Sequence, residues 1–444
     1  MSTGTASAAA VMAAARAGDA AQARALLATI VREEFSLPVA EITLGTDGYS
    51  LNSVNGFITT DSGESFFFKF HHEEGEDSVL QEFYRGEVLQ AAGYPIDMPV
   101  HVCRRVGRQI LLYRRRHTPR LADAARAVDH GDPLPDAPAD ALLGAQAALD
   151  DLTAAIYRAS WHPIDAATSA AEPVHQLFFH RLVTPGRPTD VLGGRAATFF
   201  AADRLFTLPG ATLGGADLLD LRWVIDGTPY HGTLRTCLES SLRLLTPAAL
   251  AHGGGVVAHG DAHNANVWFD PAHADTPAHL TFFDPAFAGT HVPALLAEVK
   301  ATFHNILAHP DWLYHPADLA AQPHIRVTDG VATVTSGWAP TPLRRAFLRG
   351  KAQRLWRPLL ALLHAHDALG PEWRQTLRCA LFCCPTLVMD LCPAGVRHTP
   401  QSALNGLAVA MMCGAEPERA GADPVARFLD TLDPTRADPD FASI

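Results

Sequence analysis

Three short apolar runs, each bordered by polar turns, lie in the middle of the sequence between stretches with helical periodicity. The runs are residues 255–258, 267–269 and 280–283. The turns that border them contain Asp261, Asn266 and Asp284. Polar side chains where strands meet loops are the usual places for binding and catalysis, because a rigid scaffold holds them there. The segment from residue 256 to 290 is therefore the candidate functional segment.

The residue types in these turns predict magnesium and proton-transfer chemistry. An Asp, an Asn and a second Asp offer the hard oxygen ligands that suit Mg²⁺ bound to nucleotide phosphates. One carboxylate can meanwhile accept the proton of an attacking hydroxyl. We assign Asp261 as the catalytic carboxylate, and Asn266 and Asp284 as the metal ligands.

The first quarter of the chain is predicted to contain two kinds of structure. Ala, Leu and Val recur at helical spacing over residues 6–33, so residues 1–35 form an N-terminal helical extension. After them come β-rich runs at residues 39–44, 54–60 and 65–70, a helix at 78–92, and two more strands at 98–104 and 109–114. Turn residues separate the first three runs, which is typical of an antiparallel meander. Residues 36–118 are therefore predicted to be a small antiparallel lobe.

The rest of the chain, residues 119–444, is predicted to be mainly helical. Residues 120–138 are rich in Ala, Asp and Pro, and they are predicted to be a linker or mobile insertion. Helices are predicted at residues 139–160, 233–246, 293–308, 342–369, 371–390 and 401–413, with a strand near 219–225. The fold class predicted from the whole pattern is α+β.

The charge balance excludes one class of partner and favours another. The chain of 444 residues has 35 Lys and Arg against 47 Asp and Glu, a net charge of −12. This argues against nucleic-acid binding, which depends on basic side chains at phosphates. Acidic residues recur in the segment 120–138, and such a surface favours a cationic small molecule over an anionic one.

Hydropathy and cysteine usage indicate a cytoplasmic protein. No run of about 18 apolar residues is present, so we expect no membrane-spanning helix and no membrane partner. The N-terminus lacks a basic start followed by an apolar stretch, so a secretory signal is not expected. Four of the seven cysteines lie within residues 379–392 without paired zinc-site spacing, which favours reduced thiols in a helical core over a metal site.

The spacing of the polar turns leads to a family resemblance. An Asp, an Asn five residues later, and another Asp after a short hairpin form the spacing of a kinase catalytic loop. The sequence His259-Gly260-Asp261, with His263 and Asn266, resembles that of the aminoglycoside phosphotransferase and choline kinase superfamily. The resemblance covers roughly residues 40–310. It implies a two-lobed protein-kinase-like fold, a small antiparallel β-sheet lobe beside a large mainly helical lobe, with ATP and Mg²⁺ as cofactors.

The resemblance also implies an ion pair in the smaller lobe. A kinase-like fold needs a strand lysine for the α- and β-phosphates and a helix glutamate to hold it. Lys69 is a lone cation in an apolar strand, and a buried lysine needs a partner. Glu87, in the following predicted helix, is the preferred partner over Glu82. The alternative is that Lys69 is an edge-strand charge with its ammonium group in water.

Two further nucleotide contacts are implied by position in the family fold. Residues 45–54 are similar to the family's phosphate turn, so Ser50, Asn52 and Ser53 are candidate phosphate contacts. An ordinary hairpin turn explains the same residues equally well. Backbone groups at the end of the fifth strand, at Leu112 and Tyr113, would face adenine.

The two histidines of the motif admit two interpretations. In the resemblance, His259 supports the loop by hydrogen bonding, and His263 lies near the substrate. Alternatively, His259, Asp261 and His263 could be three ligands of a metal-dependent hydrolase. That interpretation leaves Asn266 and Lys69 unexplained.

Some features depart from the family pattern and leave the reaction open. Pro285 follows Asp284 and restricts its backbone, which would alter the metal geometry. This departure motivates a second hypothesis, a nucleotide-binding pseudokinase or regulatory module. Nucleotidyl transfer is a third hypothesis. The sequence does not decide whether the nucleotide is ATP or GTP, or whether the protein is a monomer or a homodimer. Glu298 and Lys300 are either structural stand-ins for the acidic phrase of relatives or part of a solvated helix face. His304 and residues 312–315 either line the acceptor site or pack in the core.

The main hypothesis is ATP-dependent phosphorylation of a hydroxyl on a small molecule, such as an amino alcohol, a sugar, an antibiotic or an amino-acid derivative. The scaffold serves many acceptors, so the resemblance does not identify this one.

Overall fold

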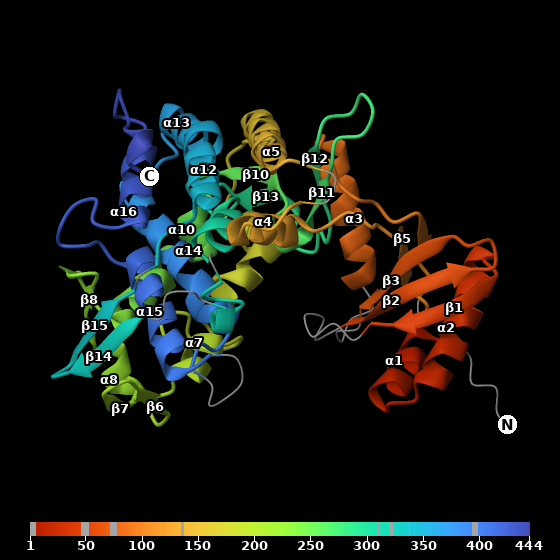
Figure 1. The fold of residues 1–444 in the computed structure, drawn as a ribbon, viewed down its shortest axis with the longest axis horizontal. Helices are drawn as coiled ribbons and strands as arrows, with labels where there is room; N and C mark the ends of the chain where they lie inside the picture. Colours follow the sequence, from red (N-terminus) through yellow and green to blue (C-terminus); the bar gives the residue numbers. More distant parts are fainter. Residues whose placement is uncertain are drawn as a thin grey trace. The chain divides into compact units, whose positions relative to one another are not determined.

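The computed structural model describes residues 6–45, 53–71, 78–105, 107–134, 137–308, 311–318, 323–336, 338–392 and 398–444. The chain forms two compact units. Unit 1 comprises Met1–Ala91, Pro95–Thr118 and Phe282–Ala286, and unit 2 comprises Ala92–Tyr94, Pro119–Thr281 and Phe287–Ile444. Figure 1 shows the elements of both units, coloured along the chain.

Unit 1 is built on one antiparallel sheet. Its elements are α1 (Ala8–Arg16), α2 (Ala20–Phe35), β1 (Val39–Leu44), β2 (Ser53–Thr60), β3 (Ser65–His71), α3 (Ser78–Ala91), β4 (His101–Cys103) and β5 (Ile110–Arg114). The strand order is β1-β2-β3-β5-β4, and every pair is antiparallel. The helix α3 thus connects two strands that are not neighbours. The predicted strands and the connecting helix are confirmed.

The two faces of this sheet differ in what covers them. Side chains alternate between faces along a strand, so Phe66 and Phe68 point to one face while Phe67 and Lys69 point to the other. Phe66 and Phe68 are buried in one core with α1 and α2, including Leu27. The predicted N-terminal extension is therefore part of the core of unit 1, because its apolar stripe covers the sheet.

Unit 2 is mainly helical, with small sheets between the helices (Figure 1). Its longer helices are α4 (Leu121–His130), α5 (Ala139–Ser160), α9 (Leu234–Leu244), α12 (Pro342–Gly350), α13 (Arg357–Ala365), α14 (Trp373–Val388), α15 (Pro400–Gly414) and α16 (Pro424–Leu432). Its shorter helices are α6 (Ala166–Ala170), α7 (Gly194–Phe199), α8 (Gly215–Leu219), α10 (Pro247–Ala251) and α11 (Val299–Thr302).

The strands of unit 2 form four small sheets. They are β6 (Leu205–Leu208), β7 (Ala211–Gly214), β8 (Arg222–Ile225), β9 (Thr228–Pro229), β10 (Gly255–Ala258), β11 (Val267–Asp270), β12 (His279–Phe282), β13 (Gly289–Pro293), β14 (His324–Thr328) and β15 (Val331–Thr335). β10 pairs with β13 and β11 with β12, so the candidate functional segment is held by two small ladders. The α+β fold class, a small antiparallel sheet with a larger, mainly helical part, is confirmed.

The prediction for residues 120–138 is wrong over most of its length. Residues 121–130 form α4, which buries Leu121, Ala124 and Ala125. The side chain of Arg126 in α4 pairs with Asp311 and Asp318 at 2.9 and 2.8 Å. The Ala- and Asp-rich composition here belongs to a helix with one apolar face and one charged face. A linker can have the same composition, so composition did not distinguish the two.

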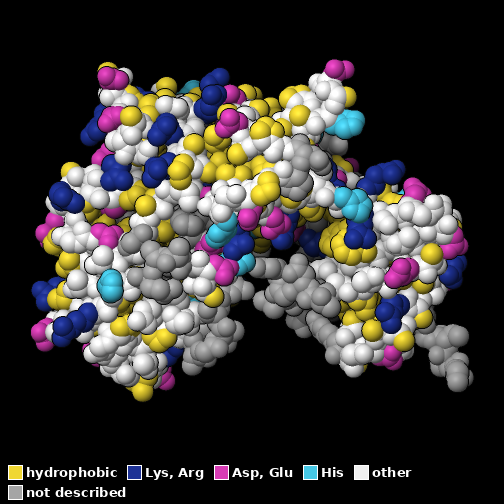
Figure 2. Space-filling view, in the orientation of Figure 1, with side chains coloured by type: hydrophobic (Ala, Val, Ile, Leu, Met, Phe, Trp, Pro, Cys, Tyr) yellow, Lys and Arg dark blue, Asp and Glu magenta, His cyan; other side chains and the backbone are white. Residues whose placement is uncertain are grey.

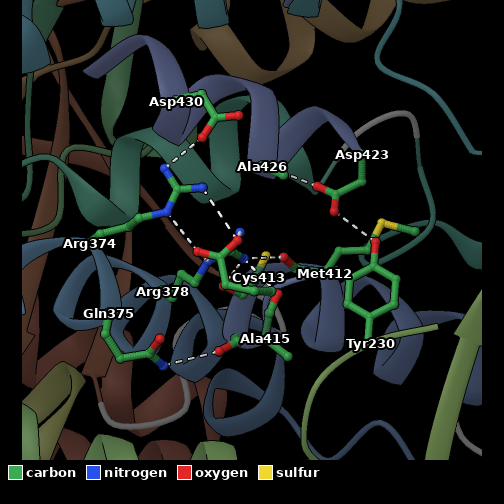
Figure 3. A network of polar contacts seen from close by, with 12 residues as sticks. Tyr230, Arg374, Gln375, Arg378, Met412, Cys413, Ala415, Asp423, Ala426 and Asp430 are labelled. Carbon is green, nitrogen blue, oxygen red and sulfur yellow. Dashed lines mark hydrogen bonds and ion pairs between the residues drawn. The ribbon is translucent and has the colours of Figure 1, made fainter. Parts of the chain in front are cut away.

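A buried polar network joins α14 to the end of α15 (Figure 3). Arg378, whose side chain is fully buried, donates to the carbonyls of Met412, Cys413 and Ala415 at 2.8–3.3 Å, so it satisfies the open end of α15. It also pairs with Glu416 at 2.6 Å. Burial opposes ionisation of Glu416, but hydrogen bonds from Arg374 and Arg378 outweigh it and lower its pKa to about 2.

Replacing Glu416 by Gln is expected to destabilise the protein in a pH-dependent way. The loss should be about 1–3 kcal/mol near pH 7, toward the lower end because Glu416 is 38% exposed and screened. Its pKa is lower in the folded chain, so its contribution is present above about pH 4.5 and fades as the pH falls toward 2. Urea unfolding of wild type and variant at several pH values, with exposed Glu418→Gln as control, measures the difference. A difference that does not shrink in acid would contradict this account.

The surface of the described residues carries both signs of charge. Figure 2 shows Lys and Arg interspersed with Asp and Glu over the visible faces of both units. Within the described residues, no helix is long and apolar enough to cross a membrane. Cys379, Cys383 and Cys384 lie buried in α14, and burial raises the pKa of each thiol, as expected for packed core cysteines.

Candidate active site

An ion pair joins two candidate residues that are far apart in the sequence. In unit 1, Lys69 Nζ lies 2.8 Å from Asp284 Oδ1, across 215 residues of chain. Lys69 is on the sheet face opposite α1 and α2, and its side chain is 11% exposed while that of Asp284 is 38% exposed. The sheet thus holds the lysine, and the segment after β12 brings the carboxylate to it.

The backbone at Asp284 is held in an uncommon conformation. Its φ is +54°, in the left-handed region that Asp tolerates better than most residues. Pro285 follows and disfavours the right-handed helical region at Asp284. The segment is anchored on the other side by hydrogen bonds from Phe282 to Pro95 and from Asp97 to Phe282, both 2.7 Å. The predicted effect of Pro285 on the backbone thus coincides with a turn that presents the Asp284 carboxylate to Lys69.

The other candidates in unit 1 have different placements. Glu87 is exposed on α3, and among the described residues it forms no ion pair with Lys69. Glu82 lies on the same helix, but its side chain is outside the described residues. The preference for Glu87 over Glu82 therefore stays a prediction.

The predicted adenine and phosphate contacts also depend on the sheet. Leu112 and Tyr113 lie within β5 and are buried. The Leu112 carbonyl accepts a 2.8 Å hydrogen bond from Val100, so sheet pairing already uses it. Ser53 is the first residue of β2, and its side chain is not described. Ser50 and Asn52 lie outside the described residues.

The loop around Asp261 in unit 2 is fixed by its own hydrogen bonds. Nδ1 of His259 accepts from the Asp261 N–H at 3.3 Å, and Asn266 Nδ2 donates to the Asp261 carbonyl at 3.1 Å. Gly260 has φ +75°, and a Cβ there would lie 2.4 Å from the Phe287 carbonyl oxygen. Only glycine fits this close approach without a shift. The Asn266 amide donates through its nitrogen, which leaves its oxygen for a cation.

Cationic side chains surround the Asp261 carboxylate. Lys300 Nζ lies 3.7 Å from its Oδ1, and His263 Nε2 lies 3.7 Å from its Oδ2. Burial alone would raise the pKa of Asp261, but His263 and Lys300, with His259 and Arg181 behind them, hold it below its usual value. Oδ1 is buried and accepts no hydrogen bond from the described residues. Asp261 is therefore an ionised carboxylate with an unused acceptor atom.

A short chain of side chains extends from Lys300 away from Asp261. Lys300 Nζ lies 2.9 Å from His304 Nε2, and the Tyr314 hydroxyl lies 2.5 Å from His304 Nδ1. Lys300 is in α11, and His304 is in the π-helical turn that follows, η4 (Phe303–Leu307). Burial lowers the pKa of Lys300, against the pull of Asp261. The sequence signal for this contact is the spacing of four residues between Lys300 and His304, which places both side chains on one face of a helix.

The hydrolase interpretation finds no support in this geometry. His259 uses Nδ1 to accept from the loop backbone, and His263 lies beside the carboxylate of Asp261. Across the described parts of the chain, no three His, Cys, Asp or Glu side chains form a group that could hold a metal ion. Asn266 in unit 2 and Asp284 in unit 1 each carry an oxygen of the type that suits Mg²⁺.

Comparisons with known proteins give distant similarity in structure only. No family model and no curated sequence matches the chain. Similar solved structures include the GDP and kanamycin complex of APH(2″)-IIia, at 12% identity and TM-score 0.39, covering 87% of this chain and 97% of that one. A microcompartment-associated aminopropanol kinase matches at 12% identity and TM-score 0.37, covering 87% and 95%. An ethanolamine kinase of Plasmodium vivax matches at 8% identity and TM-score 0.41, covering 90% and 86%. Function is therefore inferred from the residues of the site.

Proposed function

We propose that this protein is a phosphotransferase that moves the terminal phosphoryl group of ATP to a hydroxyl of a small molecule. The observation that supports this best is the 2.8 Å ion pair between Lys69 and Asp284. It joins a strand lysine suited to the phosphates with the carboxylate suited to their magnesium ion. Neither an edge-strand lysine nor a three-ligand hydrolase requires that pairing.

The proposed mechanism gives each residue one task. Asp261 accepts the proton of the acceptor hydroxyl at its unused Oδ1, while Lys300 and His263 keep it ionised. Lys69 binds the α- and β-phosphates as a point charge. Asn266 and Asp284 would hold Mg²⁺, which neutralises charge on the transferred group. Phosphoryl transfer asks mainly for positioning and charge neutralisation, and both are properties of these side chains.

The same features favour catalysis over a nucleotide-binding regulatory module. Such a module needs Lys69 and Asp284 but has no use for a buried carboxylate kept ionised by neighbouring cations. Burying Asp261 with an unused acceptor atom costs stability, and catalysis would account for that cost. Acceptor identity and nucleotide preference stay open in this proposal.

Replacing Asp284 by Asn is expected to lower magnesium-dependent ATP use by about 100-fold or more, because one charged metal ligand is lost. Asn also tolerates a positive φ, so the backbone should hold. ADP formation from MgATP, measured with a panel of hydroxylated metabolites, gives the readout. The control is Asp275→Asn, an exposed residue of the connection between β11 and β12. Unchanged magnesium dependence in the Asp284 variant would contradict the proposed function.

A further inference from the structure

The charge close to Asp261 is positive, although the chain as a whole is acidic. Lys300 of α11, Arg181 of the 3-10 turn η2 (Phe179–Arg181) and Arg195 of α7 interact electrostatically with one another, and Asp261 acts on both Lys300 and Arg181. These elements pack together: α7 contacts η2 and α14, and α14 contacts α11. Lys300 and Arg181 thus both act on the Asp261 carboxylate, and the exposed Arg195 acts on those two cations.

Two of these three cations have clear protein partners. Lys300 lies beside Asp261 at 3.7 Å and His304 at 2.9 Å. Arg195 donates to the carbonyls of Leu387 and Val388 at 3.0 Å. The first set of contacts holds Lys300 beside the Asp261 loop, and the second holds Arg195 at the end of α14.

Arg181 is different, because its guanidinium has no such partner. Its Nη1 is buried and donates to no atom of the described residues, and no ion pair involves it there. Burial and the nearby Arg195 lower its pKa to about 10. A buried guanidinium nitrogen without a hydrogen-bond partner destabilises a fold, so packing alone does not account for it. A planar guanidinium matches a carboxylate or a phosphate with two parallel hydrogen bonds.

We propose that Arg181 binds an anionic group, a carboxylate or a phosphate, on the same acceptor whose hydroxyl faces Asp261. This inference rests on the proposed function and names its substrate class. It reverses the expectation drawn from the acidic surface. Charges within a few ångströms in a buried site act more strongly than surface charges screened by salt over about 8–10 Å.

Four small polyols that differ mainly in charge test the inference. They are glycerol (neutral), serinol (cationic), glycerate (carboxylate) and glycerol 3-phosphate (phosphate). ADP formation from MgATP reports their use as acceptors, and the shift in unfolding temperature without nucleotide reports their binding. The proteins are wild type, Arg181→Gln, Arg181→Lys, and Arg187→Gln, an exposed arginine six residues along as matched control.

Wild type and the Arg187 variant should prefer glycerate or glycerol 3-phosphate over glycerol and serinol. Whichever of the two anions is preferred distinguishes carboxylate from phosphate recognition. Arg181→Gln should weaken the response to that anion by about 10-fold or more, and Arg181→Lys by less. The Gln variant should unfold at the same or a higher temperature than wild type without ligand, whereas loss of a purely structural arginine would lower it.

Equal responses to all four polyols, a preference for serinol, or no anion binding to wild type would overturn the inference. So would an anion response that survives in Arg181→Gln. Failure of the proposed function has a separate signature, because wild type would then form no ADP from MgATP with any of the acceptors, whether or not it binds MgATP. The nucleotide-free binding measurement decides the role of Arg181 in either case.

Discussion

Replacing Asp261 by Asn should lower the rate of phosphoryl transfer by about 10²–10⁴-fold, the range expected for loss of a general base. The amide has nearly the same shape as the carboxylate, so the loop bonds from His259 and Asn266 to the backbone of residue 261 should remain. The side chain can no longer accept a proton. Lys300 also loses its counter-ion at 3.7 Å, so part of the effect comes from changed charge at the site.

The readouts for this variant separate chemistry from binding and folding. Turnover at saturating MgATP should fall, while the dissociation constant for MgATP should change by less than about threefold, since Asp261 is not proposed to contact the nucleotide. Exposed Asp203→Asn should behave as wild type in both measurements. Near-wild-type turnover in Asp261→Asn would place proton acceptance elsewhere and remove the main support for the catalytic assignment.

The elements that the sequence predicted well are those with local signals. The β-rich run around Lys69 predicts a strand, and the strand β3 is present there. The turn at Asp261 is likewise visible locally, because the loop is closed by bonds between residues at most five apart in sequence. Strand-forming residue types and short-range turn chemistry are enough to predict such a strand and such a turn.

Features that depend on distant packing could not be predicted in the same way. The residue of α3 that faces Lys69 depends on how the helix is rotated about its own axis. The sequence of the helix alone does not determine that rotation. Lys300 is nearly fully buried only because α14 and the Asp261 loop surround α11. In α4 the buried apolar residues recur every three or four positions. The residue composition of such a helix does not distinguish it from a linker.

The positive charge around Asp261 is a local feature that the net charge of the chain does not show. A total of −12 describes the surface, where solvent and salt screen each charge. The pKa of Asp261 responds instead to nearby cations such as Lys300 of α11 and Arg181 of η2, which no window of sequence brings together.

Replacing Lys69 by Met should lower kcat/KM for ATP by about 10²–10³-fold, because a preorganised charge beside the phosphates is lost. The effect on the free energy of unfolding should stay below about 1 kcal/mol, since Asp284 is 38% exposed and its charge returns to solvent. Lys69→Arg should recover only part of the activity, because a guanidinium does not replace a point charge in shape.

A double-mutant cycle distinguishes this role from a plain ion pair. The control is Arg114→Met, which removes an exposed cation of β5 that lies 3.9 Å from Glu64. If Lys69 and Asp284 act together on the magnesium-nucleotide complex, the loss in kcat/KM for Lys69→Met with Asp284→Asn should be much smaller than the product of the two single losses. Because β3 lies between β2 and β5, Lys69 is not an edge-strand charge. Unchanged nucleotide kinetics in Lys69→Met, or independent effects in the cycle, would leave the Lys69–Asp284 contact as a structural ion pair without a role at the nucleotide.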